Sequence, residues 1–130
     1  MPEVTPYICV SDARAAVDWY VSSLGGTVTV EPMVMDDGRV GHAEVSFDGA
    51  RVMMSDPHPE IQVEPPAPGR GSAVTLYLAV PDCRATTERA VTGGATLDRG
   101  PEENDRGWVA VLRDPFGHRW YLHTDAAPTG

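Results

Sequence analysis

The sequence predicts an α+β fold made of two tandem βαβββ modules whose curved sheets surround a cleft. Internal repetition is the first observation behind this prediction, because six residues recur 70 positions later within one stretch of eleven. The identical pairs are Thr5 and Thr75, Tyr7 and Tyr77, Val10 and Val80, Asp12 and Asp82, Arg14 and Arg84, and Ala15 and Ala85. The second observation is that both copies show the same order of strand-like and helix-like segments. A chain of 130 residues has room for one compact domain built from two such halves.

The first copy begins with a strand-like segment at residues 4–10, which is rich in β-branched and aromatic residues. Asp12 follows as a predicted helix N-cap, because its carboxylate can accept hydrogen bonds from the free N–H groups of the first helical turn. The helix has apolar residues at helical spacing and ends at Gly25-Gly26. Three more strands are expected at residues 27–35, 40–47 and 51–56, joined by turns that contain glycine.

The second copy repeats this order. A strand is expected at residues 74–80, Asp82 is the predicted N-cap, and the helix runs to about Gly93-Gly94. The remaining strands are expected at residues 95–99, 107–113 and 118–124.

Between the copies lies a connection, residues 57–71, that is rich in proline and glycine. The stretch DPHPEIQVEPPAPGRGS has five prolines, so it predicts an extended surface segment with no helix. We therefore expect a single domain at residues 1–130, with module one at about 1–56 and module two at about 72–125.

Composition excludes several classes of function. All ten basic residues are arginine, so no lysine is present for a Schiff base or a phosphate-binding loop. The net charge of −9 argues against nucleic acid and anionic lipid as partners. Cys9 and Cys83 are too few for a disulfide framework, and no apolar run approaches the length of a membrane span. These features predict a soluble cytoplasmic protein.

Four motifs in order resemble those of the vicinal-oxygen-chelate superfamily, which includes glyoxalase I, extradiol dioxygenases and bleomycin-resistance proteins. They are V-x-D at the end of the first strand of each copy, WYVSSLGG (19–26), DGRVGHAEV (37–45) and DPFGHRWYL (114–122). The resemblance covers nearly the whole chain and is greatest to the PhnB-like branch. The stretch PEENDRGWVAV (101–111) departs from that branch's pattern.

The resemblance implies a divalent metal held by one residue on the first and one on the last strand of each module, acting as a Lewis acid. The residues at these positions here are Thr5, Met53, Thr75 and Tyr121. None is a usual ligand, since divalent cations prefer imidazole, carboxylate or thiolate. The expected protein therefore has no metal cofactor at the usual site.

A displaced metal site is the alternative. His42 and Glu44 lie two residues apart on an expected strand and so share a face, and His123 shares a face with Tyr121. If these residues hold a divalent metal, the protein would be a lyase, isomerase or dioxygenase. Paired-carboxylate chemistry by Glu44 and Asp56 also remains open.

The leading interpretation is a protein that binds a small molecule, as bleomycin-resistance proteins sequester a drug without altering it. Aromatic and soft apolar side chains fall where the superfamily builds its cleft: Tyr7, Met53, Tyr77, Trp108 and Tyr121. With the acidic first half, they favour a cationic or neutral aromatic ligand. By the resemblance, we also expect a homodimer.

Trp19 and Tyr20 are expected in the core, and Cys9 as a buried, inert thiol. A regulatory subunit whose cleft is filled by its own side chains is the third interpretation.

Overall fold

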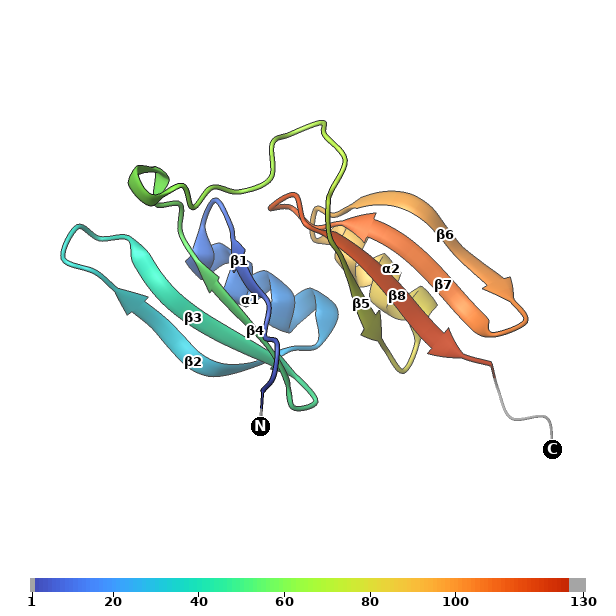
Figure 1. The fold of residues 1–130 in the computed structure, drawn as a ribbon. Helices are drawn as coiled ribbons and strands as arrows, with labels where there is room; N and C mark the ends of the chain where they lie inside the picture. Colours follow the sequence, from blue (N-terminus) through green and yellow to red (C-terminus); the bar gives the residue numbers. More distant parts are fainter. Residues whose placement is uncertain (1, 127–130) are drawn as a thin grey trace. The chain divides into compact units, whose positions relative to one another are not determined.

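The protein forms two compact units, residues 1–67 and 68–130, each with one sheet and one helix (Figure 1). The structure is a computed structural model and describes residues 2–126. Each unit is considered by itself. The elements of unit one are β1 (Tyr7–Cys9), α1 (Ala13–Leu24), β2 (Thr27–Val34), β3 (Val40–Phe47), β4 (Ala50–Ser55) and the 3₁₀ turn η1 (Pro59–Ile61). Those of unit two are β5 (Thr75–Ala79), α2 (Cys83–Thr92), β6 (Thr96–Asn104), β7 (Gly107–Arg113) and β8 (Arg119–Asp125).

The two sheets have the same topology, which confirms the predicted α+β fold of two βαβββ modules. Their strand orders are β1-β4-β3-β2 and β5-β8-β7-β6, and the outermost strands β1 and β5 run parallel to their neighbours. One helix covers one face of each sheet (Figure 1). Since strand residues alternate between faces, every second residue of these strands points away from the helix.

The helix starts follow the sequence prediction. Asp12 and Asp82 each accept a hydrogen bond of 3.1 Å from the backbone N–H three residues later. Gly25 ends α1 with φ of 81°, a left-handed conformation that glycine adopts without the steric cost of a Cβ.

The core of unit one lies between α1 and the sheet. Tyr20 of α1 and Met54 of β4 are almost fully buried there, and Trp19 is also buried, as predicted for Trp19 and Tyr20. In unit two, Trp120 and Leu122 of β8 are buried in the same way.

Trp120 also donates a hydrogen bond of 2.9 Å to the buried Asp114, whose other oxygen accepts from the N–H groups of Phe116 and His118. The DPFGHRW motif therefore has a structural role.

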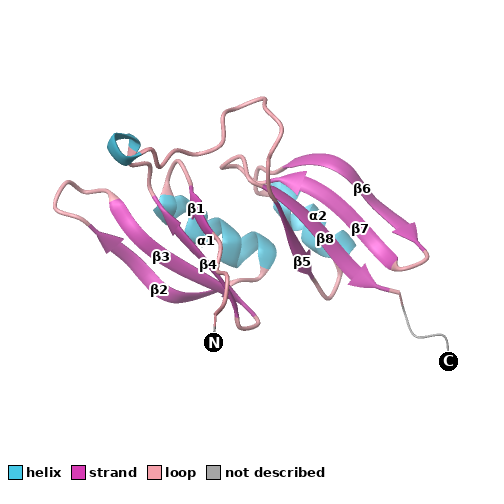
Figure 2. Cartoon of the chain, in the orientation of Figure 1, coloured by secondary structure: helices cyan, strands magenta, loops and turns pink. Residues whose placement is uncertain are grey.

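Two expectations about local structure are wrong. The connection contains a helical turn, η1 (Figure 2). It also contains a β-bridge between His58 and Val63. A proline at the first position of a helical turn is compatible with it, because its missing N–H would have no partner there anyway. Strand β6 is also longer than expected, since it continues past Gly100-Pro101 through register shifts that hide its alternation.

Among the described residues, no helix has both the length and the apolar character that crossing a bilayer requires.

Candidate functional site

The free face of the first sheet, opposite α1, carries a row of the side chains that the sequence analysis singled out. Tyr7 pairs with Met53, and Met53 pairs with Glu44, so these residues lie side by side on β1, β4 and β3. His42 lies on the same face, because it is two residues from Glu44 on the same strand. The alternation predicted from the sequence for His42 and Glu44 is thus present on β3.

The strand register shows which residues of the first strand lie beside the last strand of each unit. Tyr7, two residues after Thr5, is the residue beside Met53. In unit two Tyr77 is beside Tyr121, while Thr75 pairs with Arg119 and accepts a hydrogen bond of 2.6 Å from it. In each unit, the two positions that correspond to metal ligands in the superfamily are therefore not direct cross-strand neighbours.

Glu44 and His42 have partners within the protein. The buried Glu44 carboxylate accepts a hydrogen bond of 2.6 Å from Thr29 and lies 3.4 Å from Arg51. His42 Nδ1 lies 3.1 Å from the Tyr7 hydroxyl. In unit two, His123 lies 2.8 Å from Asp125. Within residues 2–126, no three His, Cys, Asp or Glu side chains group closely enough to hold a metal ion. These side chains thus do not fit the displaced metal site as a cluster.

Asp56 also has a structural role. One of its carboxylate oxygens accepts from the Ala13 N–H at the start of α1 and the other from the Val40 N–H, both at 2.7 Å. In unit two, the Thr124 hydroxyl has the corresponding role at the start of α2, where it accepts a hydrogen bond of 2.7 Å from the Cys83 N–H. Since Asp56 and Glu44 have different partners, the structure does not bring them together as a catalytic pair.

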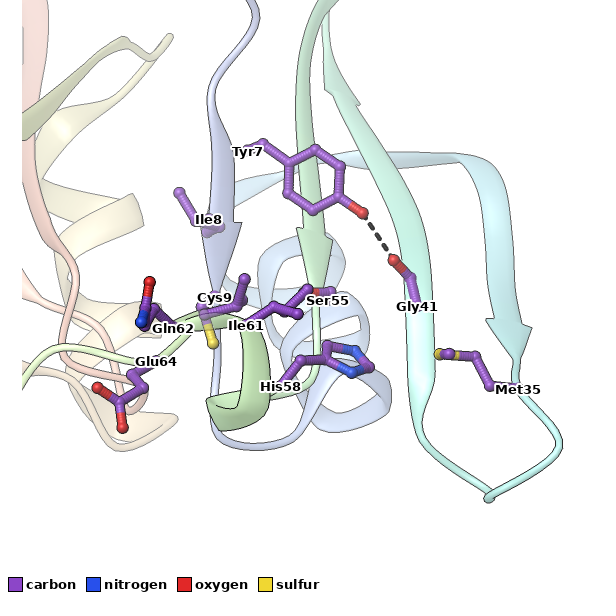
Figure 3. Close-up of a pocket in the computed structure, with 11 residues that line it drawn as sticks. Tyr7, Ile8, Cys9, Met35, Gly41, Ser55, His58, Ile61, Gln62 and Glu64 are labelled. Carbon is purple, nitrogen blue, oxygen red and sulfur yellow. Dashed lines mark hydrogen bonds between the residues drawn. The ribbon is translucent and has the colours of Figure 1, made fainter.

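A cavity of about 710 Å³ opens on the free face of the first sheet (Figure 3). Its lining residues come from the strands and from the connection: Tyr7, Ile8, Cys9, Met35, Gly41, Ser55, His58, Ile61, Gln62, Val63 and Glu64. Tyr7 is half exposed, and its hydroxyl donates a hydrogen bond of 2.6 Å to the Gly41 carbonyl. Met35 and Ile61 are also exposed apolar side chains. A concave, mainly apolar site with few polar groups is typical of a small-molecule pocket.

The charge of the cavity is negative. Glu64 lines it, and none of the described lining residues is an arginine. Burial raises the pKa of the Cys9 thiol, and the carboxylates of Asp56 and Glu64 raise it further. Burial also raises the pKa of Tyr7, so its phenol stays neutral at physiological pH. The cavity therefore has a mainly apolar lining with one acidic side chain, Glu64.

Three lining residues have roles that the sequence analysis missed. Cys9, expected to be buried, is partly exposed and lines the cavity. His58, within the connection, is buried, and Ile61 belongs to η1 and is exposed. The apolar Ile61 and Val63 within a proline-rich stretch were the available signal, because a fully solvated connection has little use for them.

A second aromatic surface lies in unit two. The rings of Tyr77 and Tyr121 stack at 5.3 Å between centroids, and His123 lies 5.9 Å from Tyr77. These three residues line a cavity of about 320 Å³ together with Asn104, Asp105, Arg106 and Val109. Desolvation, with smaller contributions from Tyr121 and Asp125, raises the pKa of Tyr77.

Trp108 lies apart from the other predicted ligand-binding residues. It pairs with Thr124, and the alternation of β7 puts it on the face opposite His123 and Tyr121. The Arg84 guanidinium of α2 lies over its ring, 4.8 Å from the centroid. The structure thus places Tyr7 and Met53 on one free face, Tyr77 and Tyr121 on the other, and Trp108 beside α2.

Comparison with known proteins gives a consistent family. The family model described as "Glyoxalase/Bleomycin resistance protein/Dioxygenase superfamily" matches residues 3–122. An uncharacterized protein of Mycobacterium bovis, Mb0911c, is 34% identical over 128 residues, covering 93% of this chain and 82% of its own length.

Two solved structures are also similar. Protein PA1353 from Pseudomonas aeruginosa has a TM-score of 0.70 at 22% identity, covering 96% of this chain and 98% of that one. TnmS3, an antibiotic binding protein from Streptomyces sp. CB03234, has a TM-score of 0.64 at 25% identity, covering 97% and 98%.

Proposed function

Because the chain belongs to the Glyoxalase/Bleomycin resistance protein/Dioxygenase superfamily, we propose that it binds a small aromatic molecule, neutral or cationic, in the unit-one cavity. The cavity carries this proposal. Tyr7, Met35 and Ile61 are among its apolar and aromatic lining residues, and Glu64 is its acidic side chain. Flat and polarisable walls suit planar ligands, and a nearby carboxylate favours a positive charge.

The similarity to TnmS3 supports a binding role. That protein is described as an antibiotic binding protein, and the similarity covers nearly all of both chains. We propose that this protein likewise retains its ligand without altering it and needs no metal cofactor. Tyr77 and Tyr121 form a separate aromatic surface in unit two, which is the alternative place for an aromatic ligand to bind.

The family branch and the assembly also belong to the proposal. GRVGHAE and DPFGHRW support the PhnB-like branch. We propose a cytoplasmic homodimer; in the described part of the chain Cys9 and Cys83 form no disulfide, which agrees with a reducing compartment.

Fluorescent aromatic probes of different charge test the proposed ligand class. We would titrate the full chain with neutral N-phenylnaphthylamine, its sulfonated anion anilinonaphthalene sulfonate, and the planar cation proflavine. The proposal predicts dissociation constants of about 10 µM for the neutral and cationic probes and at least about tenfold weaker binding of the anion. Preferential binding of the anion, or no binding of any probe, would contradict it.

Metal analysis of protein purified without chelator tests whether the protein binds its ligand without a metal cofactor. The proposal predicts no stoichiometric metal and unchanged probe affinities after treatment with chelator. Near-stoichiometric zinc, iron, nickel or manganese that is lost in a His42→Ala or Glu44→Gln variant would favour the lyase, isomerase or dioxygenase alternative.

A further inference from the structure

We infer that residues 57–64, named here the cavity wall, determine which ligands the unit-one cavity accepts. In this inference Glu64 selects positive charge, and Arg39, from the hairpin between β2 and β3, is the positioning residue that holds the wall in place. The inference rests on the proposed function, because it names the part of that site that sets its specificity.

The cavity wall supplies much of the cavity's surface. Five of the eleven lining residues belong to it: His58, Ile61, Gln62, Val63 and Glu64. Figure 3 shows η1 beside Cys9 and His58, where it bounds one side of the cavity. A ligand in this cavity therefore contacts the strands on one side and the wall on the other.

The wall has a defined backbone conformation although it follows a proline-rich pattern. His58 and Val63 exchange backbone hydrogen bonds of 2.8 and 3.1 Å, and the Ile61 N–H donates to the His58 carbonyl at 3.0 Å. These bonds close a compact loop around η1. The backbone of Ile61 and Val63 is thus held in place relative to His58.

Arg39 joins this loop to the sheet. Its guanidinium donates to Glu60 at 2.7 and 3.2 Å, to the Pro57 carbonyl at 3.3 Å, and to Asp37 at 2.7 Å. Below it, the buried His58 imidazole lies 3.4 Å from the Val40 carbonyl. A single exposed ion pair contributes little to stability, but one guanidinium that binds three groups in two segments restricts how they move.

The charges of the wall leave one carboxylate free for a ligand. Glu60 is occupied by Arg39, and the neighbouring Asp56 is occupied by two backbone N–H groups. Glu64 has no hydrogen bond or ion pair with any described residue, and its charge contributes to the raised pKa of Cys9 within the cavity. In the cavity of about 320 Å³ in unit two, by comparison, both Asp105 and Arg106 belong to the lining, so their charges offset each other. A cationic ligand is therefore expected to prefer unit one.

The Glu64→Gln variant tests charge selection. Because Glu64 is exposed, we expect the affinity of this variant for proflavine to fall about three- to fivefold and its affinity for N-phenylnaphthylamine to change less than about twofold. Glu103→Gln is the matched control, because it makes the same change of net charge on an exposed side chain of unit two. Equal losses of proflavine binding in both variants, or no loss in Glu64→Gln, would overturn the role of Glu64.

The Arg39→Met variant tests the positioning role. We expect amide hydrogen exchange of Ile61, Gln62 and Val63 to be at least about tenfold faster and the affinity for both probes to fall. Arg113→Met is the control, since Arg113 makes an ion pair with Asp98 and its side chain is, like that of Arg39, 35% exposed. Unchanged exchange in the wall would overturn the role of Arg39.

The two proposals fail in different ways. If no probe binds the wild-type protein, the proposed function fails, while hydrogen exchange still decides whether Arg39 holds the wall. If the wild type binds both probes and neither variant changes affinity, the proposed function stands and the inference about the wall is wrong.

Discussion

The Tyr7 hydroxyl on β1 donates a hydrogen bond of 2.6 Å to the Gly41 carbonyl on β3, across the intervening strand β4 (Figure 3). Gly41 also leaves room for Met35, because a Cβ at this position would lie 3.0 Å from the Met35 sulfur. The bond fixes the phenol ring at the edge of the cavity, although about half of the side chain is exposed to solvent.

Replacing Tyr7 with phenylalanine removes this bond and the 3.1 Å contact between the hydroxyl and His42 Nδ1, and it leaves the ring. We expect the free energy of unfolding to fall by about 1 kcal/mol, because the Gly41 carbonyl loses its hydroxyl donor. Tyr77→Phe is the matched control, since the Tyr77 hydroxyl has no hydrogen bond to any described residue, and it is expected to change stability by less than about 0.5 kcal/mol. Chemical denaturation of both variants measures the difference. Equal effects would show that the bond to Gly41 contributes nothing.

Asp56→Asn tests the structural role of the carboxylate at the start of α1. An amide side chain has one acceptor oxygen, so it cannot accept from both Ala13 and Val40, as the carboxylate does. We expect a loss of about 1–3 kcal/mol in the free energy of unfolding. Asp18→Asn, at an exposed position of α1, is the control. A similarly small change in both variants would argue against this role.

The Arg39 network predicts a pH dependence. Hydrogen bonds from Arg39 lower the pKa of Asp37 and of Glu60 in the folded protein. A lowered carboxyl pKa stabilises the fold fully above the unfolded value of about 4, and this stabilisation is lost as the pH falls through the folded pKa. The melting temperature of wild type should therefore exceed that of Arg39→Met near neutral pH, and the gap should close in acid. A gap that is constant down to about pH 2 would contradict this account.

The reactivity of the two thiols tests the electrostatics of the cavity. Cys9 is partly exposed, whereas Cys83 is 1% exposed. Iodoacetamide should therefore alkylate Cys9 first, with a rate that keeps rising above the ordinary thiol pKa of about 8.5, because the reactive form is the thiolate. Glu64→Gln should accelerate the reaction near pH 8, since it removes one of the charges that raise the pKa of Cys9. Mass spectrometry of the labelled peptides gives both rates. Faster labelling of Cys83, or no effect of Glu64→Gln, would contradict the described cavity.

The fold was largely predictable because its signals are local or repeated. The 70-residue offset between Tyr7 and Tyr77 holds in the structure, where each tyrosine lies beside the last strand of its sheet. Asp12 and Asp82 cap their helices as N-cap chemistry predicts. These features depend on backbone hydrogen bonding within a few residues and on strand alternation, and both can be deduced from sequence.

The cavity was less predictable because it depends on where a connecting segment packs. Proline content predicted an extended connection with no helix, which is wrong at η1, and it carries no information about the contact of Glu60 with Arg39, 21 residues earlier. The side of the sheet that Trp108 occupies was also not predicted, since it depends on the register that pairs Trp108 of β7 with Thr124 of β8. Tertiary packing decided both.

A nuclear magnetic resonance titration of the isotope-labelled full chain with proflavine tests the central claim most directly, because it locates the ligand by residue. The account predicts that amide shifts concentrate at Cys9, Gly41 and residues 61–64, around the unit-one cavity. Shifts concentrated instead at Tyr77, Arg106 and Tyr121, or no shifts at saturating probe, would contradict the claim that the unit-one cavity is the binding site.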